Sequence, residues 1–218
     1  MNPVIEIFVK AAQYAASHSA ELGQAIGDHL RLVSIAMLIS ILACVPLGVW
    51  TSRSRWASLA LMNAINAIRV VPSLAILFLV IPYLGLSTTS AAVALTVLAL
   101  PPVLINTDAA FRSLDPAVLE AARGMGMTTW QRLLWVEFPL ALPVILAGIR
   151  TAAVEVISSA TLAAFVGSGG LGIYITRGFA LFDYAILLVG AVPVALLALL
   201  SEAVLASIQR AVLPYQFR

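Results

Sequence analysis

Charged and amide side chains lie inside runs of otherwise apolar residues, where their chemistry stands out. Asn63, Asn66 and Arg69 recur every three residues, which places them on one face of a helix. Arg150 and Glu155 share another apolar run. An arginine can bind a carboxylate and a glutamate can bind a quaternary ammonium, so these residues could line the path of a small charged solute.

The same residues have a structural alternative. Arg69 or Arg150 could pair with Glu155 and hold two helices together. In either case the charges should face a pore or another helix, because an arginine near the bilayer centre costs about 2.5–3.5 kcal/mol on insertion scales. The sequence leaves both alternatives open.

A glycine-rich stretch, Gly167-Ser168-Gly169-Gly170-Leu171-Gly172, is the other candidate for chemistry. It lacks the lysine and hydroxyl of a phosphate-binding loop, and no strand precedes it, so we predict no nucleotide site and no cofactor on this chain. We expect a tight outward-facing turn or a re-entrant segment, although glycine also permits the positive φ of an ordinary loop. His18, His29 and Cys44 have no metal-binding spacing, so no metal site is expected.

The composition identifies the solvent around these residues as lipid. Of the 218 residues, 62% are hydrophobic and only 10% are charged, against about 25% charged in soluble domains. Five apolar runs are near or above the roughly 20 residues that cross a bilayer, and in lipid they must be helical. They cover residues 32–50, 57–82, 89–105, 139–163 and 184–208. We therefore predict an all-α, polytopic membrane helical bundle of about five transmembrane helices.

Basic residues outside the runs predict the orientation of this bundle. One side would carry seven of them and the other three, Lys10, Arg31 and Arg177. The seven are Arg53, Arg55, Arg112, Arg123, Arg132, Arg210 and Arg218. The positive-inside rule places the richer side in the cytoplasm, with the N-terminus outside and the C-terminus inside. Residues 1–28 would form an extracytoplasmic segment without signal-peptide character, and 29–218 the membrane domain.

The long polar loop 106–138 would lie on the cytoplasmic side. Asp115-Pro116 predicts a helix start, an N-cap acceptor followed by proline at the first helical position. Gly124 and Gly126 would end this short helix, and Thr128 or Thr129 would cap a second one, with Trp130, Leu133, Leu134 and Val136 on its apolar face. The next span would begin at Pro139 and Pro143. Helix pairs of this kind commonly rest in the lipid headgroups.

The order of residues in this loop favours a more specific interpretation. Glu120-Ala121-Ala122 is followed after three residues by Gly126, and after nine more by Val136-Glu137-Phe138-Pro139. This pattern resembles the EAA loop of binding-protein-dependent ABC importer permeases, with Val136 for isoleucine and Phe138 for leucine. The stretches EAARGMGM (120–127), EFPLALPVILAGIRT (137–151) and SSATLAAFVGSGGLG (158–172) are similar to the osmoprotectant branch, which imports glycine betaine, carnitine and choline.

The resemblance implies a type I, methionine-permease-like fold in the bacterial inner membrane and a non-catalytic transport role. It implies two ATPase subunits that hold ATP and Mg²⁺, a second permease copy (identical or homologous), and an extracytoplasmic substrate-binding protein. The first short helix would dock in a groove of the ATPase. The residues implied in this coupling are Glu120, Ala121, Ala122, Gly124, Gly126 and Pro139. Gly167, Gly169, Gly170 and Gly172 would touch the binding protein or form part of an outer gate.

Other functions remain as alternatives. A permease for methionine or another small solute would share the same loop. An intramembrane enzyme would need a catalytic set inside the spans, where no histidine, lysine or well-buried aspartate is predicted. A channel would not require the EAA spacing.

Overall fold

The computed structural model describes residues 3–212, and within this range every regular element is a helix. The predicted all-α architecture is confirmed. The elements are α1 (Pro3–Ser17), α2 (Ser19–Ser52), α3 (Arg55–Val70), α4 (Ser73–Leu84), α5 (Thr88–Arg112), α6 (Pro116–Gly124), α7 (Thr129–Arg132), the π-helix η1 (Leu133–Glu137), α8 (Phe138–Ser159), the 3₁₀-helix η2 (Ala160–Val166), α9 (Gly172–Leu181) and α10 (Tyr184–Val212).

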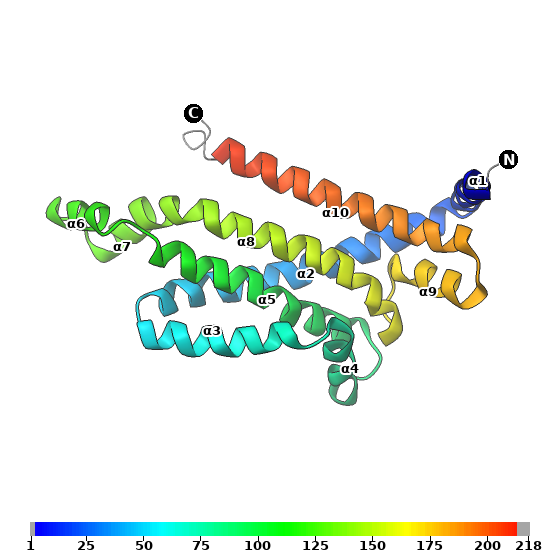
Figure 1. Ribbon diagram of the computed structural model, residues 1–218, viewed down its shortest axis with the longest axis horizontal. Helices are drawn as coiled ribbons and strands as arrows, with labels where there is room; N and C mark the ends of the chain where they lie inside the picture. The colour runs from blue at the N-terminus through cyan, green and yellow to red at the C-terminus, as the bar shows by residue number, and fades with distance from the viewer. Residues whose placement is uncertain (1–2, 213–218) are drawn as a thin grey trace.

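In the described part of the chain, four continuous helical stretches are long and apolar enough to cross a membrane. They are Ser19–Ser52, Thr88–Arg112, Thr129–Val166 and Tyr184–Ala211, and they lie roughly along the long axis of the molecule (Figure 1). A fifth crossing exists only if α3 and α4 count as one span. The predicted number of about five crossings therefore includes one broken crossing.

The predicted span over 57–82 is broken in the structure, because α3 and α4 meet at an angle of 96°. Pro72 explains the break. The residue before a proline is driven out of the helical region, and Val71 is extended, with φ −74° and ψ 124°. Val70 therefore ends α3, and Ser73 begins α4 in a new direction. The bend at Pro72 is therefore close to a right angle.

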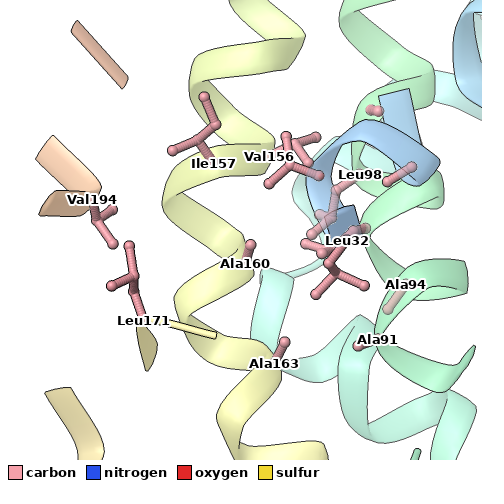
Figure 2. Packing of buried hydrophobic residues seen from close by; sticks show 14 of the residues in the cluster. Leu32, Ala91, Ala94, Leu98, Val156, Ile157, Ala160, Ala163, Leu171 and Val194 are labelled. Atoms are coloured by element: carbon pink, nitrogen blue, oxygen red, sulfur yellow. The ribbon is translucent and has the colours of Figure 1, made fainter. Parts of the chain in front are cut away.

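Helix α5 is the centre of the bundle, packed between α2 on one side and α8 on the other. It is the most buried of the four long helical stretches. Figure 2 shows Ala91 and Ala94 of α5 facing Ala160 and Ala163 of η2, with Leu32 of α2 beside them. Small side chains let helix backbones approach closely, which is how helices associate in lipid.

The two ends of the bundle differ. At one end lie α6, α7 and the turn between α2 and α3; at the other lie α1, α4 and α9 (Figure 1). Within the predicted extracytoplasmic segment 1–28, the described residues 3–28 form α1 and the first turns of α2. Helix α1 packs on α10, where Ile7 and Phe8 share an apolar pocket with Tyr184 and Leu187. Arg218, counted in the orientation argument, lies outside the described residues.

The close contact between α5 and α8 predicts that the stability of the protein is sensitive to a larger side chain at Gly148. A Cβ atom at Gly148 would lie 2.5 Å from the Asn106 Cβ and 2.7 Å from the Pro102 carbonyl oxygen. We expect Gly148→Ala to lower the free energy of unfolding by about 1–3 kcal/mol through overpacking. Thermal melting of the detergent-purified protein measures this as a fall of several degrees in Tm.

Gly23→Ala is the matched control, because a Cβ there meets nothing within 4 Å. Alanine favours a helix over glycine by roughly 0.5–1 kcal/mol, so this variant should melt at the same temperature or higher. Equal losses in both variants would contradict the packing assigned to Gly148.

Candidate functional site

Helix α6 begins as the sequence predicts. Asp115 is the N-cap, and its Oδ1 accepts a hydrogen bond of 2.8 Å from the Ala117 backbone N–H. Pro116 follows at the first helical turn, where its missing N–H leaves no bond unmade. The helix ends at Gly124, so the predicted start and end of the first short helix are both confirmed.

The turn after α6 depends on Gly126 rather than Gly124. Gly126 has φ +76°, in the left-handed region that disfavours residues with a Cβ, while Gly124 does not. Its N–H donates to the Arg123 carbonyl, and the next N–H, of Met127, donates to that of Ala122. These bonds satisfy the end of the helix and turn the chain toward α7.

Helix α7 is capped by Thr128, one of the two predicted candidates. The Thr128 Oγ1 accepts from the Gln131 N–H at 3.3 Å, and the Gln131 side chain accepts from the Thr128 N–H at 2.8 Å. This is a capping box. The prediction that a new span begins at Pro139 is wrong, because Thr129–Val166 is one continuous helical stretch. A π-turn, in which the Phe138 N–H donates to the Leu133 carbonyl, precedes Pro139.

The residues implied in coupling differ in exposure. Glu120, Ala121, Gly124 and Gly126 are exposed at the tip of the molecule, as is Pro139 further along. Ala122 is the exception, since only 1% of its surface is exposed. Its small side chain therefore serves the packing of α6 against its neighbours rather than an outward-facing contact. The turn also exposes Met125, which the sequence analysis did not single out.

The apolar face predicted for the second short helix is divided. Trp130 and Leu134 are exposed, whereas Leu133 and Val136 are half-buried against the bundle. Trp135, which is also exposed, adds to the outward apolar surface. This surface is therefore available to lipid or to another subunit.

Glu137 is the residue that sequence reasoning missed. It is 1% exposed, and its Oε1 accepts a hydrogen bond of 2.8 Å from the Arg132 Nε. Its Oε2 accepts from the Arg53 Nη2, and Arg53 lies in the turn between α2 and α3. We call Arg53, Arg132 and Glu137 the Glu137 cluster. The only signal in the sequence was a carboxylate directly before the Phe138-Pro139 pair.

Asp108 was also missed as a structural residue. It is buried in α5 and accepts hydrogen bonds from Thr51 Oγ1 at 2.9 Å and Ser58 Oγ at 2.8 Å. The Arg112 Nε lies 4.0 Å from its Oδ2. Asp108 thus ties the end of α2 and the start of α3 to α5. The loop was predicted to begin at residue 106, but residues 106–112 belong to α5. Asp108 was therefore predicted to be a loop residue, and its role in packing was missed.

The polar stripe of α3 is present and exposed, with Asn63, Asn66 and Arg69 all accessible on the single chain. Arg69 lies at the end of α3, next to the break. It lines a pocket of about 240 Å³ together with Pro72 and with Glu155 of α8. The structure therefore brings Arg69 and Glu155 to one cavity, at the broken span.

Arg150 does not join this pocket, and its predicted pairing with Glu155 is wrong. Its guanidinium donates to Glu202 and, at 3.1 Å, to Gln209 Oε1, both on α10. Arg150 and Glu155 are five positions apart in the sequence, so their side chains point about 140° apart around the helix. Arg150 holds α8 to α10, while Glu155 faces the opposite way.

The glycine-rich stretch forms a turn that packs against α2. Gly167 and Gly170 have positive φ, +75° and +100°. A Cβ at Gly169 would lie 3.1 Å from the Asp28 carboxylate, and one at Gly172 only 2.0 Å from the Thr161 carbonyl oxygen. After this turn α9 packs back along α10. The stretch lies at the end of the bundle away from α6 (Figure 1).

Comparison with known proteins agrees with this geometry. Residues 44–214 match the family described as the binding-protein-dependent transport system inner membrane component. The chain is 41% identical to the glycine betaine/carnitine/choline transport system permease protein OpuCB of Bacillus subtilis over 91% of both chains. It is 38% identical to the osmoprotectant import permease protein OsmW of Salmonella typhimurium, over 94% of this chain and 98% of that protein.

Solved structures show the same fold. A chain of the inward-facing MetNI methionine ABC transporter superposes with a TM-score of 0.79 at 23% identity, over 90% of this chain and 98% of the other. A chain of an amino acid ABC transporter gives 0.75 at 20% identity, over 91% and 97%. The predicted methionine-permease-like fold is confirmed. The chain belongs to the binding-protein-dependent transport family, as a multi-pass inner-membrane permease subunit that performs no catalysis and works with ATPase and binding-protein partners.

Proposed function

We propose that this permease imports quaternary-ammonium osmoprotectants such as glycine betaine, carnitine or choline. The observation that carries the proposal is similarity along nearly the whole chain. Eight relatives between 35% and 41% identical are each named for one of these solutes or for osmoprotectant import. The likeness to the methionine transporter concerns the fold alone, at 23% identity.

Uptake by the reconstituted importer tests this proposal. We expect proteoliposomes that hold the permease, its ATPase and its binding protein to accumulate labelled glycine betaine, carnitine or choline when ATP is supplied inside. Labelled methionine and an importer without ATP serve as controls. Accumulation of methionine, and of none of the three ammonium compounds, would reject the substrate class.

We propose that α6 and the Gly126 turn are the contact through which the ATPase acts. Glu120, Ala121, Gly124 and Gly126 present a short, mostly small-residue surface at the tip, which can enter a groove. Two ATPases, which bind ATP and Mg²⁺, would sit at this end and below a pair of permeases, identical or homologous. The binding protein would deliver solute at the opposite end, with the N-terminus outside and the C-terminus in the cytoplasm. Pro139 shapes the helix behind this contact.

Gly126 provides a sharp test of the coupling contact. Gly126→Val has open space around it but a φ of +76°, which costs roughly 1–2 kcal/mol for a residue with a Cβ. We expect it to tilt α6 and to reduce the stimulation of ATP hydrolysis by loaded binding protein about tenfold. Gly126→Asn is the matched control, because asparagine tolerates this φ. Equal stimulation in the valine variant and in the original protein would reject the contact.

We further propose that the α3 stripe and Glu155 line the translocation path between two permease copies. Asn63, Asn66, Arg69 and Glu155 are exposed on the single chain, and exposure of such charges to lipid is unfavourable. A water-filled path or a second copy removes that cost. Arg69 and Glu155 in one pocket offer opposite charges, which suits a zwitterion such as glycine betaine. The turn at Gly167, Gly169, Gly170 and Gly172 would close the path at the outer end.

Replacement of Glu155 separates a path residue from a structural one. We expect Glu155→Gln to change the ratio of choline to glycine betaine uptake severalfold, because choline has a net positive charge that Glu155 would offset, whereas the carboxylate of glycine betaine makes that solute neutral overall. The melting temperature should stay within a few degrees of that of the original protein.

Glu202→Gln is the control, since Glu202 pairs with Arg150 on the other side of α8. It should lower the melting temperature and leave the uptake ratio unchanged. An unchanged ratio in Glu155→Gln would reject the path role.

A further inference from the structure

We infer that the Glu137 cluster is the joint that carries movement of the α6–α7 segment to α3. The inference rests on the proposed coupling role of α6. It assigns a positioning role to Arg53, Arg132 and Glu137, none of which belongs to the coupling contact itself.

The joint spans two parts of the chain that the backbone does not connect directly. Glu137 ends the π-turn that leads from α7 into α8, and Arg132 ends α7. Arg53 lies 84 residues earlier, in the turn between α2 and α3. The Glu137 carboxylate accepts from both arginines, one on each oxygen. The buried Glu137 carboxylate therefore links the α6–α7 segment to the α2–α3 turn.

The α2–α3 turn is held on its other side by α5. Asp108 accepts hydrogen bonds from Thr51, just before the turn, and from Ser58, just after it. The guanidinium of Arg53 also lies 6.0 Å from the centre of the Phe111 ring of α5. The turn is thus attached to α5 before, within and after the bend of the chain. These three contacts hold the backbone of the turn in one shape, so a displacement would move the turn as a rigid unit.

Beyond its first turn, helix α3 has few buried contacts with the rest of the bundle. Ser58 and Ile65 are its buried residues, and the rest of the helix is exposed or half-buried. Its first turn is attached to α5 through Ser58, Arg53 holds the turn just before it, and its last turn ends at the break before Pro72. A displacement of the α2–α3 turn would therefore move the stripe of Asn63, Asn66 and Arg69 with little resistance from packing.

The chemistry of the joint suits transmission better than simple adhesion. Apolar residues of similar volume commonly stabilise a contact as well as a buried ion pair does. Hydrogen bonds between guanidinium and carboxylate groups are directional, so they fix one relative geometry. A joint that must pass on a direction of movement benefits from that property.

The test uses the whole importer in proteoliposomes, with ATPase and binding protein, and measures solute molecules imported per ATP hydrolysed. We expect Arg53→Met and Glu137→Gln each to lower this ratio roughly tenfold. The ATPase should still copurify with the permease, and loaded binding protein should still stimulate hydrolysis. The ratio of the double variant should be no lower than that of the worse single variant, because both substitutions remove the same interaction between Arg53 and Glu137.

Arg55→Met is the matched control. It removes the same charge two residues along the same turn, and among residues 3–212 Arg55 makes no ion pair. Its ratio should equal that of the original importer. The inference is overturned if the ratio is unchanged in both cluster variants, if Arg55→Met loses as much, or if uptake and hydrolysis fall together. If Glu137→Gln does not fold, Arg53→Met still decides, because the Arg53 side chain is 44% exposed.

Failure of this inference can be told apart from failure of the proposed coupling contact. Loss of the coupling contact appears in Gly126→Val as reduced stimulation of ATP hydrolysis. Loss of the joint appears as normal stimulation with poor uptake.

Discussion

Close approach of α5 to its two neighbours is the constraint on which the rest of the structure depends. A Cβ at Gly48 of α2 would lie 2.7 Å from the Thr107 side chain, and one at Gly148 of α8 would lie 2.5 Å from that of Asn106. Both contacts fall in the same turn of α5. In lipid, packing of this kind replaces the hydrophobic effect as the force between helices. It also brings Asp108 within reach of Thr51 and Ser58, which fastens α3 to the bundle.

Much of the fold could be predicted because the membrane imposes simple rules. Apolar length predicts spans, and the caps at Asp115 and Thr128 define where α6 and α7 begin. The break at Pro72 could not be predicted in size. Proline and the residue before it predict a bend, but the angle of 96° depends on what α4 packs against. The continuity of α7 with α8 was missed for a similar reason, since Pro139 usually marks a helix start, whereas a π-turn here carries the helix up to it.

The residues of the candidate site that belong to a sequence motif could be predicted. Those whose role depends only on contacts with distant parts of the chain could not. The spacing from Glu120 to Pro139 predicted the two short helices and their resemblance to an EAA loop, although it did not show that Ala122 is buried. Glu137 and Asp108 looked like polar loop residues, because their partners lie 84 and 57 residues away in the sequence. Arg150 shows the converse case. Its place in the same apolar run suggested Glu155 as a partner, but its side chain projects toward α10 and donates to Glu202.

The π-turn at Leu133–Glu137 has a consequence for how this chain can vary in length. Each residue added to or removed from a helix rotates everything beyond it by about 100°. The number of residues between Gly126 and Pro139 therefore determines the direction of the Glu137 side chain around the helix axis. With this number, Glu137 points toward the α2–α3 turn rather than into lipid. An insertion or deletion between Gly126 and Glu137 would turn Glu137 away from Arg53. The spacing of the motif corresponds, in three dimensions, to a fixed rotation of α8 relative to α6 and the Gly126 turn.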